Sequence, residues 1–287
     1  MNVSIIIVNY NTEQLVLDCI NSIQEQTKGI TFEIIVVDNN SENEPKLLKN
    51  EKRIKYIQSE INLGFGRANN LGSKQAKGDF LFFLNPDTIL INNAISILYH
   101  HMTSHSNIGI CGGNLYTNSL HYTHAYGILS PGILNEIMLF FLFKPLLLFK
   151  SEFNKTNKPI EVEYITGADL MIKRDLFFSI NGFDKDFFMY FEETYLCYQI
   201  KSLGFKIINN PIAKIIHLEG KSMTFKKHKE SLFYQGRKIY LTKRYNNFYY
   251  IICNILHAIT CISRIILFAR NNNKREMWVY RLRLLFT

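Results

Sequence analysis

The sequence predicts an α/β fold built on a mostly parallel sheet, and two observations support this prediction. Over the first 115 of the 287 residues, short apolar runs alternate with segments whose spacing suits amphipathic helices. The apolar runs are continuous rather than alternating apolar and polar, as in strands that are buried on both faces. Such strands, each followed by a helix, are typical of a parallel sheet that helices cover on both sides.

The predicted elements follow one another along the chain. Strands are expected at Val3–Val8, Phe32–Val37, Ile54–Ile57, Phe80–Leu84 and Ile108–Cys111. Helices are expected at Glu13–Gln26, Arg67–Ala76 and Asn92–Met102, the first opened by the capping residues Asn11-Thr12-Glu13. Further on, we expect a strand at Val162–Ile165, a turn at Gly167-Ala168-Asp169, a helix over Glu192–Leu203 and a strand at Phe205–Ile208.

The length suits one large α/β domain with an appendage. The five cysteines are odd in number and lack the spacing of metal ligands, which is typical of reduced thiols in a cytosolic protein. The N-terminus has neither the charged region nor the cleavage site of a signal peptide, so no secretion is expected. Pro131–Lys150 is apolar but broken by Lys144-Pro145 into runs too short to span a bilayer, and Ser151–Pro159 has the composition of a loop.

The positive charge of the chain is concentrated in its C-terminal part. Residues 221–287 hold 14 Lys and Arg against 2 Asp and Glu, whereas the whole chain has a net charge of +9. A basic segment of this kind suits nucleic acid or an anionic membrane surface. The 22 residues of Phe248–Ala269 are mostly apolar, which nucleic-acid binding leaves unexplained. We therefore expect a membrane surface and no nucleic acid as the partner.

Phe248–Ala269 has the pattern of an amphipathic helix. Polar side chains recur at spacings of three and four on one stripe, formed by Asn254, His257, Cys261 and Arg264. The opposite side carries Ile251, Ile255, Ile259 and Ile266. Because a spanning helix seldom keeps an Arg and a His, this pattern favours a helix in the plane of the membrane surface. Basic residues that suit anionic headgroups flank it: Lys238, Lys243, Arg244, Arg270, Lys274 and Arg275. A helix packed on the core of its own domain is the alternative.

Three polar loops follow predicted strands: Asn9–Thr12, Asp38–Ser41 and Asn85–Thr88. In an open α/β sheet, the loops at the carboxyl ends of the strands bind the ligand. Asp38 is suited to accept the N3–H of a uracil or thymine ring, and Tyr10 to stack on that ring. In the Gly-bearing loop Asn62–Asn70, Arg67 is suited to pair with a phosphate or a base oxygen, the alternative being a solvated residue in the first turn of a helix.

The tripeptide Asn85-Pro86-Asp87 ends the apolar run Phe80–Leu84. One carboxylate at a Pro-kinked turn suits a divalent metal, with a nucleoside diphosphate supplying two more oxygen ligands. His217, after the strand-like Ile212–Ile216, is a second candidate contact. The alternatives are a plain turn for the tripeptide and a structural role for His217.

Two adjacent carboxylates, Glu192 and Glu193, open a predicted helix after the aromatic run Phe187–Phe191. At a helix N-terminus such acids interact favourably with the macrodipole, so a capping role is one interpretation. The aromatic neighbours favour another, in which partial desolvation raises the pKa of one carboxyl and suits it to take a proton from an acceptor hydroxyl.

Taken together, these residues resemble a family 2 glycosyltransferase with the GT-A fold, in the rhamnosyltransferase-like branch that builds bacterial surface polysaccharides. The matching stretches occur in the order of the family over about the first 222 residues: Ser4–Thr12, Val36–Ser41, Asn62–Gly72, Phe83–Thr88, Thr166–Arg174, Gly182–Cys197 and His217–Ser222. One such stretch is a weak match, whereas seven in order are a specific one.

The resemblance implies that Val8, Tyr10, Asp38, Arg67 and Asn85 hold the nucleotide. Members of this kind invert the anomeric centre, which requires one base and no protein nucleophile. The metal stabilises the departing nucleoside diphosphate.

The resemblance also implies roles for the remaining motifs. Asp87 stands where the family keeps its metal motif and would ligate Mg²⁺ or Mn²⁺, with His217 as a second contact to the metal or the diphosphate. Gly167 and Ala168 would face the donor or acceptor sugar.

The chain departs from the family at one place. The usual stretch is Glu-Asp-x-Asp-Leu, whereas this sequence has Glu192-Glu193-Thr194-Tyr195-Leu196. Glu193 is the candidate base and Glu192 the second choice, although the stem of Glu193 is one methylene longer than that of Asp. The second carboxylate of the motif is replaced by the phenol of Tyr195, so a weak or inactive transferase is an alternative.

The sequence thus predicts an inverting, metal-dependent transferase in two parts: a GT-A domain over residues 1–222, divided at 115 into nucleotide-binding and acceptor halves, and a basic helical tail over 223–287. It would move rhamnose or another hexose from a dTDP- or UDP-linked donor to a lipid-linked or growing glycan. The expected location is the cytoplasm, peripheral on the inner face of the cell membrane. A non-enzymatic membrane scaffold and a nucleotidyltransferase are the alternative functions.

Overall fold

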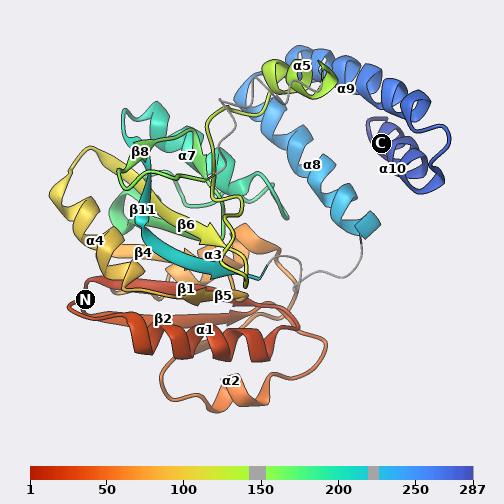
Figure 1. Ribbon diagram of the computed structural model, residues 1–287. Coiled ribbons are helices and arrows are strands. Elements are labelled where there is room, and N and C mark those ends of the chain that lie inside the picture. The colour runs from red at the N-terminus through yellow and green to blue at the C-terminus, as the bar shows by residue number, and fades with distance from the viewer. Residues whose placement is uncertain (142–152, 219–225, 287) are drawn as a thin grey trace.

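A computed structural model describes residues 1–141, 153–218 and 226–286 of the chain (Figure 1). Parts of three sequence predictions therefore lie outside the described residues. These are the end of the apolar segment 131–150, the first two residues of the loop 151–159, and residues 219–222 of the stretch after His217.

The body of the protein is built on a nine-stranded sheet with the order β3-β2-β1-β4-β10-β6-β11-β5, and β8 pairs with β11. The strands are β1 (Val3–Asn9), β2 (Phe32–Asp38), β3 (Lys55–Gln58), β4 (Phe80–Leu84), β5 (Thr88–Leu90), β6 (Ile108–Tyr116), β8 (Ile160–Glu161), β10 (Asp169–Lys173) and β11 (Lys206–His217). A separate two-stranded sheet pairs β7 (Tyr126–Gly127) with β9 (Tyr164–Ile165).

The central sheet is mostly parallel, as the continuous apolar runs predict. Strands β3, β2, β1 and β4 are parallel, and β11 is parallel to β6. The predicted fifth strand is not the neighbour of the fourth, because β10 lies between β4 and β6 and runs antiparallel to both. Ile5, Ile6, Phe82 and Phe83 are completely buried, since layers of side chains cover both faces of these strands.

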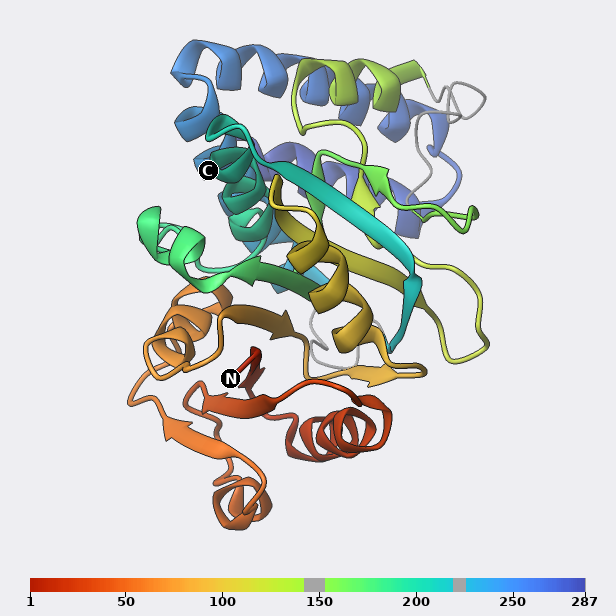
Figure 2. The ribbon, with the colours of Figure 1, turned by 90° about the vertical axis from the view of Figure 1, so that its left-hand side faces the viewer.

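Helices flank the sheet on both sides (Figures 1 and 2). They are α1 (Glu13–Gln26), α2 (Lys46–Asn50), α3 (Phe65–Ser73), α4 (Ala94–Ser104), α6 (Arg174–Ser179) and α7 (Glu192–Ser202). The predicted helices are present: α1 has the predicted bounds, α7 ends one residue earlier, and the ends of α3 and α4 are shifted by two or three residues. The expected cap of α1 differs, because the Thr12 hydroxyl donates to Asn9 Oδ1 instead of accepting from the first turn.

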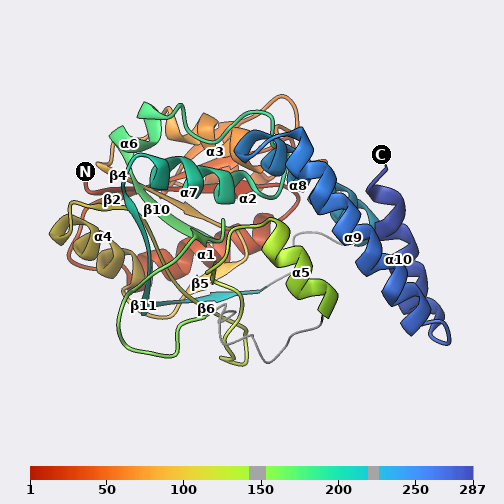
Figure 3. The same ribbon diagram turned by 90° about the horizontal axis from the view of Figure 1, so that it is seen from above.

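Three helices form the helical tail: α8 (Lys226–Arg244), α9 (Asn247–Leu267) and α10 (Asn272–Leu284). The tail lies to one side of the sheet, and α8 leads from the body into it (Figures 1 and 3). A fourth helix, α5 (Ile133–Phe141), comes from the body half of the sequence and packs along α9. The predicted boundary at residue 222 therefore separates two segments that pack together.

Buried polar side chains hold these helices to one another. Arg237 of α8 donates to Glu136 of α5 at 2.8 Å and to Asn254 of α9 at 2.7 Å. His257 of α9 lies between Glu136 and the hydroxyl of Tyr234, 2.7 Å from each. Burial raises the pKa of Glu136, but the hydrogen bond from His257 and the charge of Arg237 outweigh it and hold that pKa below its usual range.

Helix α9 buries its polar side and exposes its apolar side, which is the reverse of a surface helix in a soluble protein. His257, Cys261 and Arg264 of the predicted polar stripe are buried against the other helices, and Arg264 donates to the last carbonyls of α5. The apolar face, formed by Ile251, Ile255, Ile259, Ile262 and Ile266, is exposed, with each side chain 47 to 71% accessible. The helix thus packs on its own protein through polar groups and leaves an apolar surface uncovered.

Two of the basic residues expected to meet headgroups have other partners. Lys243 forms ion pairs with Asp184 and Asp186 of the body, and Arg244 packs on the rings of Tyr198 and Tyr245. Lys238, Arg270, Lys274 and Arg275 remain exposed, as the prediction requires.

The buried network makes a testable contribution to stability. Replacing Arg237 by Met leaves the Glu136 carboxylate without its charged partner, so we expect a loss of about 3–5 kcal/mol in the free energy of unfolding. The double variant Glu136→Leu/Arg237→Met should recover most of this loss, because no unpaired charge remains. Unfolding in urea, monitored by circular dichroism, measures the free energy of unfolding of both variants. Lys238→Met, an exposed neighbour, is the control, and an equal loss there would contradict the assignment.

Candidate active site

The carboxyl ends of β1 and β2 lie side by side, since Asn9 is the register partner of Asp38. Asn9 Nδ2 donates to Asp38 Oδ1 at 2.6 Å, and Ser41 donates to both oxygens of the same carboxylate. Gln58 Nε2 donates to Asp38 Oδ2 at 2.7 Å. Asp38 is completely buried, and these four bonds occupy the acceptor positions of its carboxylate.

In this structure Asp38 therefore holds Asn9, Ser41 and Gln58 together at the base of the crevice. A direct bond from Asp38 to a nucleotide base requires that Ser41, Asn9 or Gln58 release it, and that contact stays a prediction. The sequence placed Asn9 and Ser41 in the polar loops of the crevice without giving either a role, and it did not single out Gln58. Their role depends on side-chain contacts between three strand ends that lie far apart in the chain.

The loop before α3 forms one wall of the crevice. Val8 packs with Val37 and Ala68 beneath it, and the ring of Tyr10 is 37% exposed beside it. Arg67 Nε donates to Leu63 O at 2.6 Å, which fixes the guanidinium at the first turn of α3.

Gly64 joins this wall to the loop that precedes α7. Its φ of +78° suits glycine, and a Cβ at this position would lie 2.1 Å from Phe188 O. The next residue closes the contact, because Phe65 N–H donates to Phe188 O at 2.9 Å. The predicted nucleotide loop and the predicted catalytic loop are thus in direct contact.

The predicted metal residues also meet. His217 Nε2 lies 3.4 Å from Asp87 Oδ1 and 3.4 Å from Asn85 Nδ2. The pairing of β5 with β11 produces this contact, since His217 is the register partner of Thr88. Leu218 N–H donates to Asp87 O at 2.9 Å and fixes the end of β11 there.

Asp87 and His217 fit a divalent cation. Two ligands of an octahedral ion that are each about 2.1 Å from it stand roughly 3 Å apart, close to the observed separation. His217 Nδ1 is buried and has no hydrogen-bond partner among the described residues. No group of three or more His, Cys, Asp or Glu side chains that could hold a metal ion is found in the described ranges, so a cation needs further ligands from a bound molecule.

The Gly167-Ala168 turn connects the predicted metal residues with the candidate base. Asn85 N–H donates to Ala168 O at 3.0 Å, so the Gly167-Ala168 turn lies beside the tripeptide. A Cβ on Gly167 would lie 3.8 Å from Glu193 Cγ. The sugar-facing turn of the prediction therefore separates the Asp87–His217 pair from Glu193.

Glu192 lies next to α3, because a Cβ on Gly66 of that helix would be 3.5 Å from the Cβ of Glu192. The chain reaches α7 through Tyr190 and Phe191, which both have a φ of +69° although neither is glycine. Backbone strain of this kind is concentrated at functional sites. It turns the chain so that both carboxyl groups start the helix on the inner side.

Burial shapes the chemistry of the two carboxyls. Desolvation raises the pKa of Glu192 well above its usual range, and the charge of Glu193 adds to the effect. Desolvation also raises the pKa of Glu193, against the opposing effect of the backbone N–H groups of Glu193 and Thr194 and of the nearby His124. A carboxyl with a raised pKa is a stronger base when it is ionised.

His124 is a neighbour that the sequence did not reveal. It lies in the loop after β6 with no motif around it, and only the pairing of Ala125 with Thr166 brings it towards Glu193. Tyr195, which replaces a carboxylate of the family motif, packs its ring against Phe187 and Tyr240.

Comparisons with known proteins identify the family of the chain. The family model described as "Glycosyl transferase family 2" matches residues 4–177, which is more than half of the chain. The chain belongs to glycosyl transferase family 2. The match covers the crevice, the Asp87 turn and the Gly167-Ala168 turn of this family 2 transferase.

Curated relatives of this family 2 protein act in glycan synthesis. The chain is 25% identical over 266 residues to a rhamnosyltransferase of Escherichia coli K12, covering 84% of this chain and 96% of that protein. It is 27% identical over 229 residues to a low-salt glycan biosynthesis hexosyltransferase of Haloferax volcanii, covering 75% and 67%.

A further relative is named for a lipid diphosphate acceptor. It is an Escherichia coli UDP-Glc:alpha-D-GlcNAc-diphosphoundecaprenol beta-1,3-glucosyltransferase, 34% identical over 115 residues, which cover 39% of this chain and 45% of that protein.

Solved structures show the same fold. A mannosyltransferase from Pyrobaculum calidifontis, solved with GDP-Man and Mn²⁺, superposes with a TM-score of 0.62 at 14% identity, covering 99% of this chain and 85% of that one. The family 2 protein therefore has the predicted GT-A fold, and it is a glycosyltransferase.

Metal binding tests the site directly. Because the described part of the chain offers only Asp87 and His217 at this site, we expect Mn²⁺ by itself to bind weakly and UDP or dTDP to tighten its binding at least tenfold. Isothermal titration with and without nucleotide measures this. Asp87→Asn should abolish the tightening, whereas His228→Ala, a change at an exposed histidine of α8, should leave it intact. Equal Mn²⁺ affinity with and without nucleotide would contradict the two-ligand site.

Proposed function

We propose that this family 2 transferase is an inverting, metal-dependent hexosyltransferase. It moves a sugar such as rhamnose from a dTDP- or UDP-linked donor to a lipid-linked or growing glycan. The observation that supports this most is the line of contacts from Asp87 and His217 through Asn85 and Ala168 to Glu193. The diphosphate end of a donor and the base for an acceptor then lie on opposite sides of one sugar position.

The names of similar proteins support the choice of substrates. One relative is named a rhamnosyltransferase, and another is named for UDP-Glc and for an acceptor that carries a sugar on diphosphoundecaprenol. The similar mannosyltransferase structure contains GDP-Man with Mn²⁺. These names favour a nucleoside diphosphate sugar, a divalent cation and an acceptor held on a lipid.

Each residue of the site has one task in the proposed reaction. Tyr10 and Arg67 hold the nucleotide, with Val8, Asp38 and Asn85 shaping the crevice. Glu193 takes the proton of the acceptor hydroxyl while the acceptor oxygen bonds to the anomeric carbon and the bond to the diphosphate breaks. Attack from the side opposite the leaving group inverts the anomeric centre. A cation held by Asp87 and His217 supplies the charge that stabilises the released diphosphate.

The helical tail supports a location on the inner membrane face. Helix α9 is long and apolar enough to cross a bilayer by length and composition. However, α5, α8 and α10 pack on one side of it, and the isoleucine face, together with Phe248 and Leu267, stays exposed. A helix covered in this way suits the plane of the membrane surface, with the exposed Lys238, Arg270 and Lys274 near anionic headgroups.

Transfer of label tests the catalytic proposal. Incubation with nucleoside diphosphate sugars, Mn²⁺ and membrane extract should yield a labelled lipid-soluble product, and EDTA should stop its formation. We expect Glu193→Gln to lower kcat by about 10²- to 10⁴-fold, because the general base is lost. Asp87→Ala should lose activity to a similar extent. Because the pKa of Glu193 is raised and the base must be ionised, activity should already fall on acidification above pH 4.5, the ordinary value of a Glu.

Two outcomes decide against the proposal. Glu25→Gln, an exposed change on α1, should keep full activity, so an equal loss there would indicate general damage. If the wild-type protein binds the donor in the presence of a suitable acceptor but never turns over, a membrane scaffold is the better interpretation. The replacement of the second motif carboxylate by Tyr195 is the observation that favours that second candidate.

Vesicle binding tests the role of the tail. Wild-type protein should sediment with phosphatidylglycerol vesicles, and Ile255→Asn with Ile259→Asn should weaken binding at least tenfold, because two apolar side chains no longer enter the lipid. The control is Ile212→Asn, which changes an exposed isoleucine of the body. If the double variant sediments with the vesicles like the wild type, the isoleucine face does not contact lipid. Analytical ultracentrifugation would then show whether this face binds a second copy of the chain instead.

A further inference from the structure

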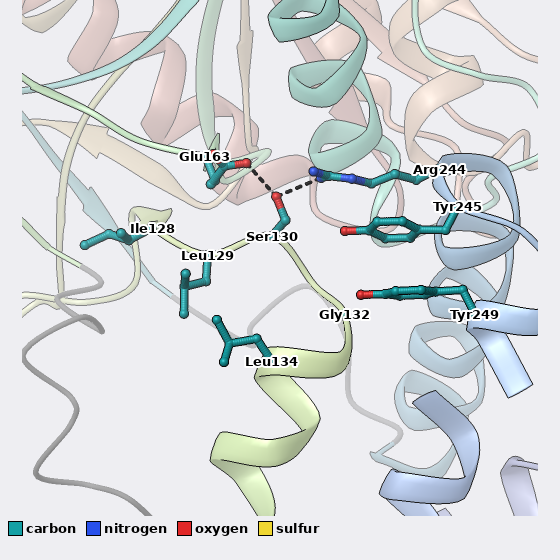
Figure 4. Close-up of a pocket in the computed structure, with 9 residues that line it drawn as sticks. All are labelled: Ile128, Leu129, Ser130, Gly132, Leu134, Glu163, Arg244, Tyr245 and Tyr249. Atoms are coloured by element: carbon teal, nitrogen blue, oxygen red, sulfur yellow. Dashed lines mark hydrogen bonds between the residues drawn. The ribbon is translucent and has the colours of Figure 1, made fainter. Parts of the chain in front are cut away.

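A pocket of about 300 Å³ lies where the body meets the helical tail, outside the crevice described above (Figure 4). Its walls come from three separate parts of the chain. The segment before α5 provides Ser130, the segment before β9 provides Glu163, and the end of α8 and start of α9 provide Arg244, Tyr245 and Tyr249. The volume is in the range of small-ligand sites.

The single carboxylate of this junction pocket is already satisfied. Lys201 donates to Glu163 Oε1 at 2.6 Å, and the Ser130 hydroxyl donates to Glu163 Oε2 at 2.5 Å. Burial raises the pKa of Glu163, but the bonds from Lys201 and Ser130 outweigh it and hold that pKa below its usual range. Glu163 is therefore ionised at neutral pH, and its charge is balanced by Lys201.

Arg244 supplies the remaining charge. Its Nη1 donates to Ser130 Oγ at 2.7 Å and to the hydroxyl of Tyr240, and the guanidinium packs on the ring of Tyr198. Both bonds use Nη1, which leaves the hydrogens of Nε and Nη2 available. No carboxylate of the described residues lies within ion-pair distance of Arg244. With Glu163 and Lys201 balanced, the pocket keeps one net positive charge.

The hydroxyl of Tyr249 adds a further donor, whereas that of Tyr245 is hydrogen-bonded to Tyr249. Tyr245 and Tyr249 are stacked with ring centroids 3.9 Å apart, and Figure 4 shows both hydroxyls pointing towards the same space. Tyr249 accepts from Ile133 N–H at 3.0 Å, so its own hydrogen is available to a ligand. Gly132 makes room for these groups, because a Cβ there would lie 2.6 Å from the Tyr249 hydroxyl. These donors and the net positive charge suit a phosphate group.

We infer that the junction pocket binds the phosphate of a lipid-linked acceptor, with Arg244 as its main contact. This inference rests on the proposed function and assigns to that function the place where the acceptor is held. The sugar of such an acceptor extends from the phosphate towards the catalytic carboxylate, and its hydrocarbon chain extends towards the membrane.

The position of the pocket suits both ends of such a molecule. Glu163 stands four residues before Gly167, so at most about 14 Å of chain separates Glu163 from the turn that lies against Glu193. A diphosphate followed by one or two sugar rings is comparable in length. On the other side, Leu134 lines the pocket and is 50% exposed at the start of α5, and Phe248 at the start of α9 is 71% exposed.

Binding of decyl diphosphate in EDTA tests the pocket without the metal site. We expect Arg244→Gln to weaken binding at least tenfold, because a charged hydrogen-bond donor is lost. Gly132→Ala should do the same by filling the space before the tyrosine hydroxyls, and it keeps the inference testable if Arg244→Gln fails to fold. Lys238→Gln removes an exposed charge on the same helix and should bind like the wild type.

Inorganic pyrophosphate distinguishes a lipid phosphate from a free one. Decyl diphosphate should bind more tightly than pyrophosphate, and equal affinities would overturn the lipid part of the inference. Unchanged binding of decyl diphosphate by both Arg244→Gln and Gly132→Ala would overturn the inference as a whole.

Kinetics separate this inference from the proposed function. With an acceptor sugar on an alkyl diphosphate, Arg244→Gln should raise the acceptor KM at least tenfold and leave the donor KM unchanged. With the matching alkyl glycoside, which lacks phosphate, wild type and Arg244→Gln should have the same KM. If the wild type transfers sugar and Arg244→Gln has an unchanged acceptor KM, the pocket is not the phosphate site. If the wild type transfers nothing, the proposed function fails, while the binding experiment still decides on the pocket.

Discussion

The insertion of β10 between β4 and β6 is the constraint on which the rest of the structure depends. It puts the start of β10 beside the end of β4, and the bond from Asn85 N–H to Ala168 O closes that contact. The predicted metal ligand Asp87 of one half of the chain, and His217 and the Gly167-Ala168 turn beside the candidate base of the other half, then lie along a single sheet. Because packed interiors deform little, their separation is fixed by the strands rather than by mobile loops.

Tyr195, which replaces a carboxylate of the family motif, connects the helix of the candidate base to the tail. Tyr195 stands in the helix that carries Glu193, and its ring contacts Phe187 of the preceding loop and Tyr240 of α8. In this protein the replaced carboxylate thus belongs to an aromatic contact between the catalytic helix and the tail. Whatever orients α8 also bears on the loop that presents Glu193, which links the position of the tail to the geometry of the site.

The tail reverses the usual arrangement of polar and apolar side chains. Its polar residues are inside because Glu136, Arg237 and His257 satisfy one another, which removes most of the cost of burying charge. Its isoleucines are outside, an arrangement that water opposes and a lipid surface favours. A transferase whose acceptor is held on a lipid would gain from this arrangement, since the exposed isoleucine face and Tyr249 of the junction pocket are both on α9.

The sequence by itself determined the strands and helices of the body, because apolar periodicity reports which sides of an element are covered. It also predicted that the Asn9, Asp38 and Asp87 segments lie at one edge of the sheet, since loops at the carboxyl ends of parallel strands converge. Only the tertiary structure decided that Asp38 is saturated by Asn9, Ser41 and Gln58, that the polar side of α9 faces inward, and that a pocket lies behind Arg244. These features join residues as distant as Glu136 and Arg237, 101 positions apart. A repeating pattern shows that one side of a helix differs in polarity from the other. The packing of the whole chain decides which neighbour, if any, covers each side.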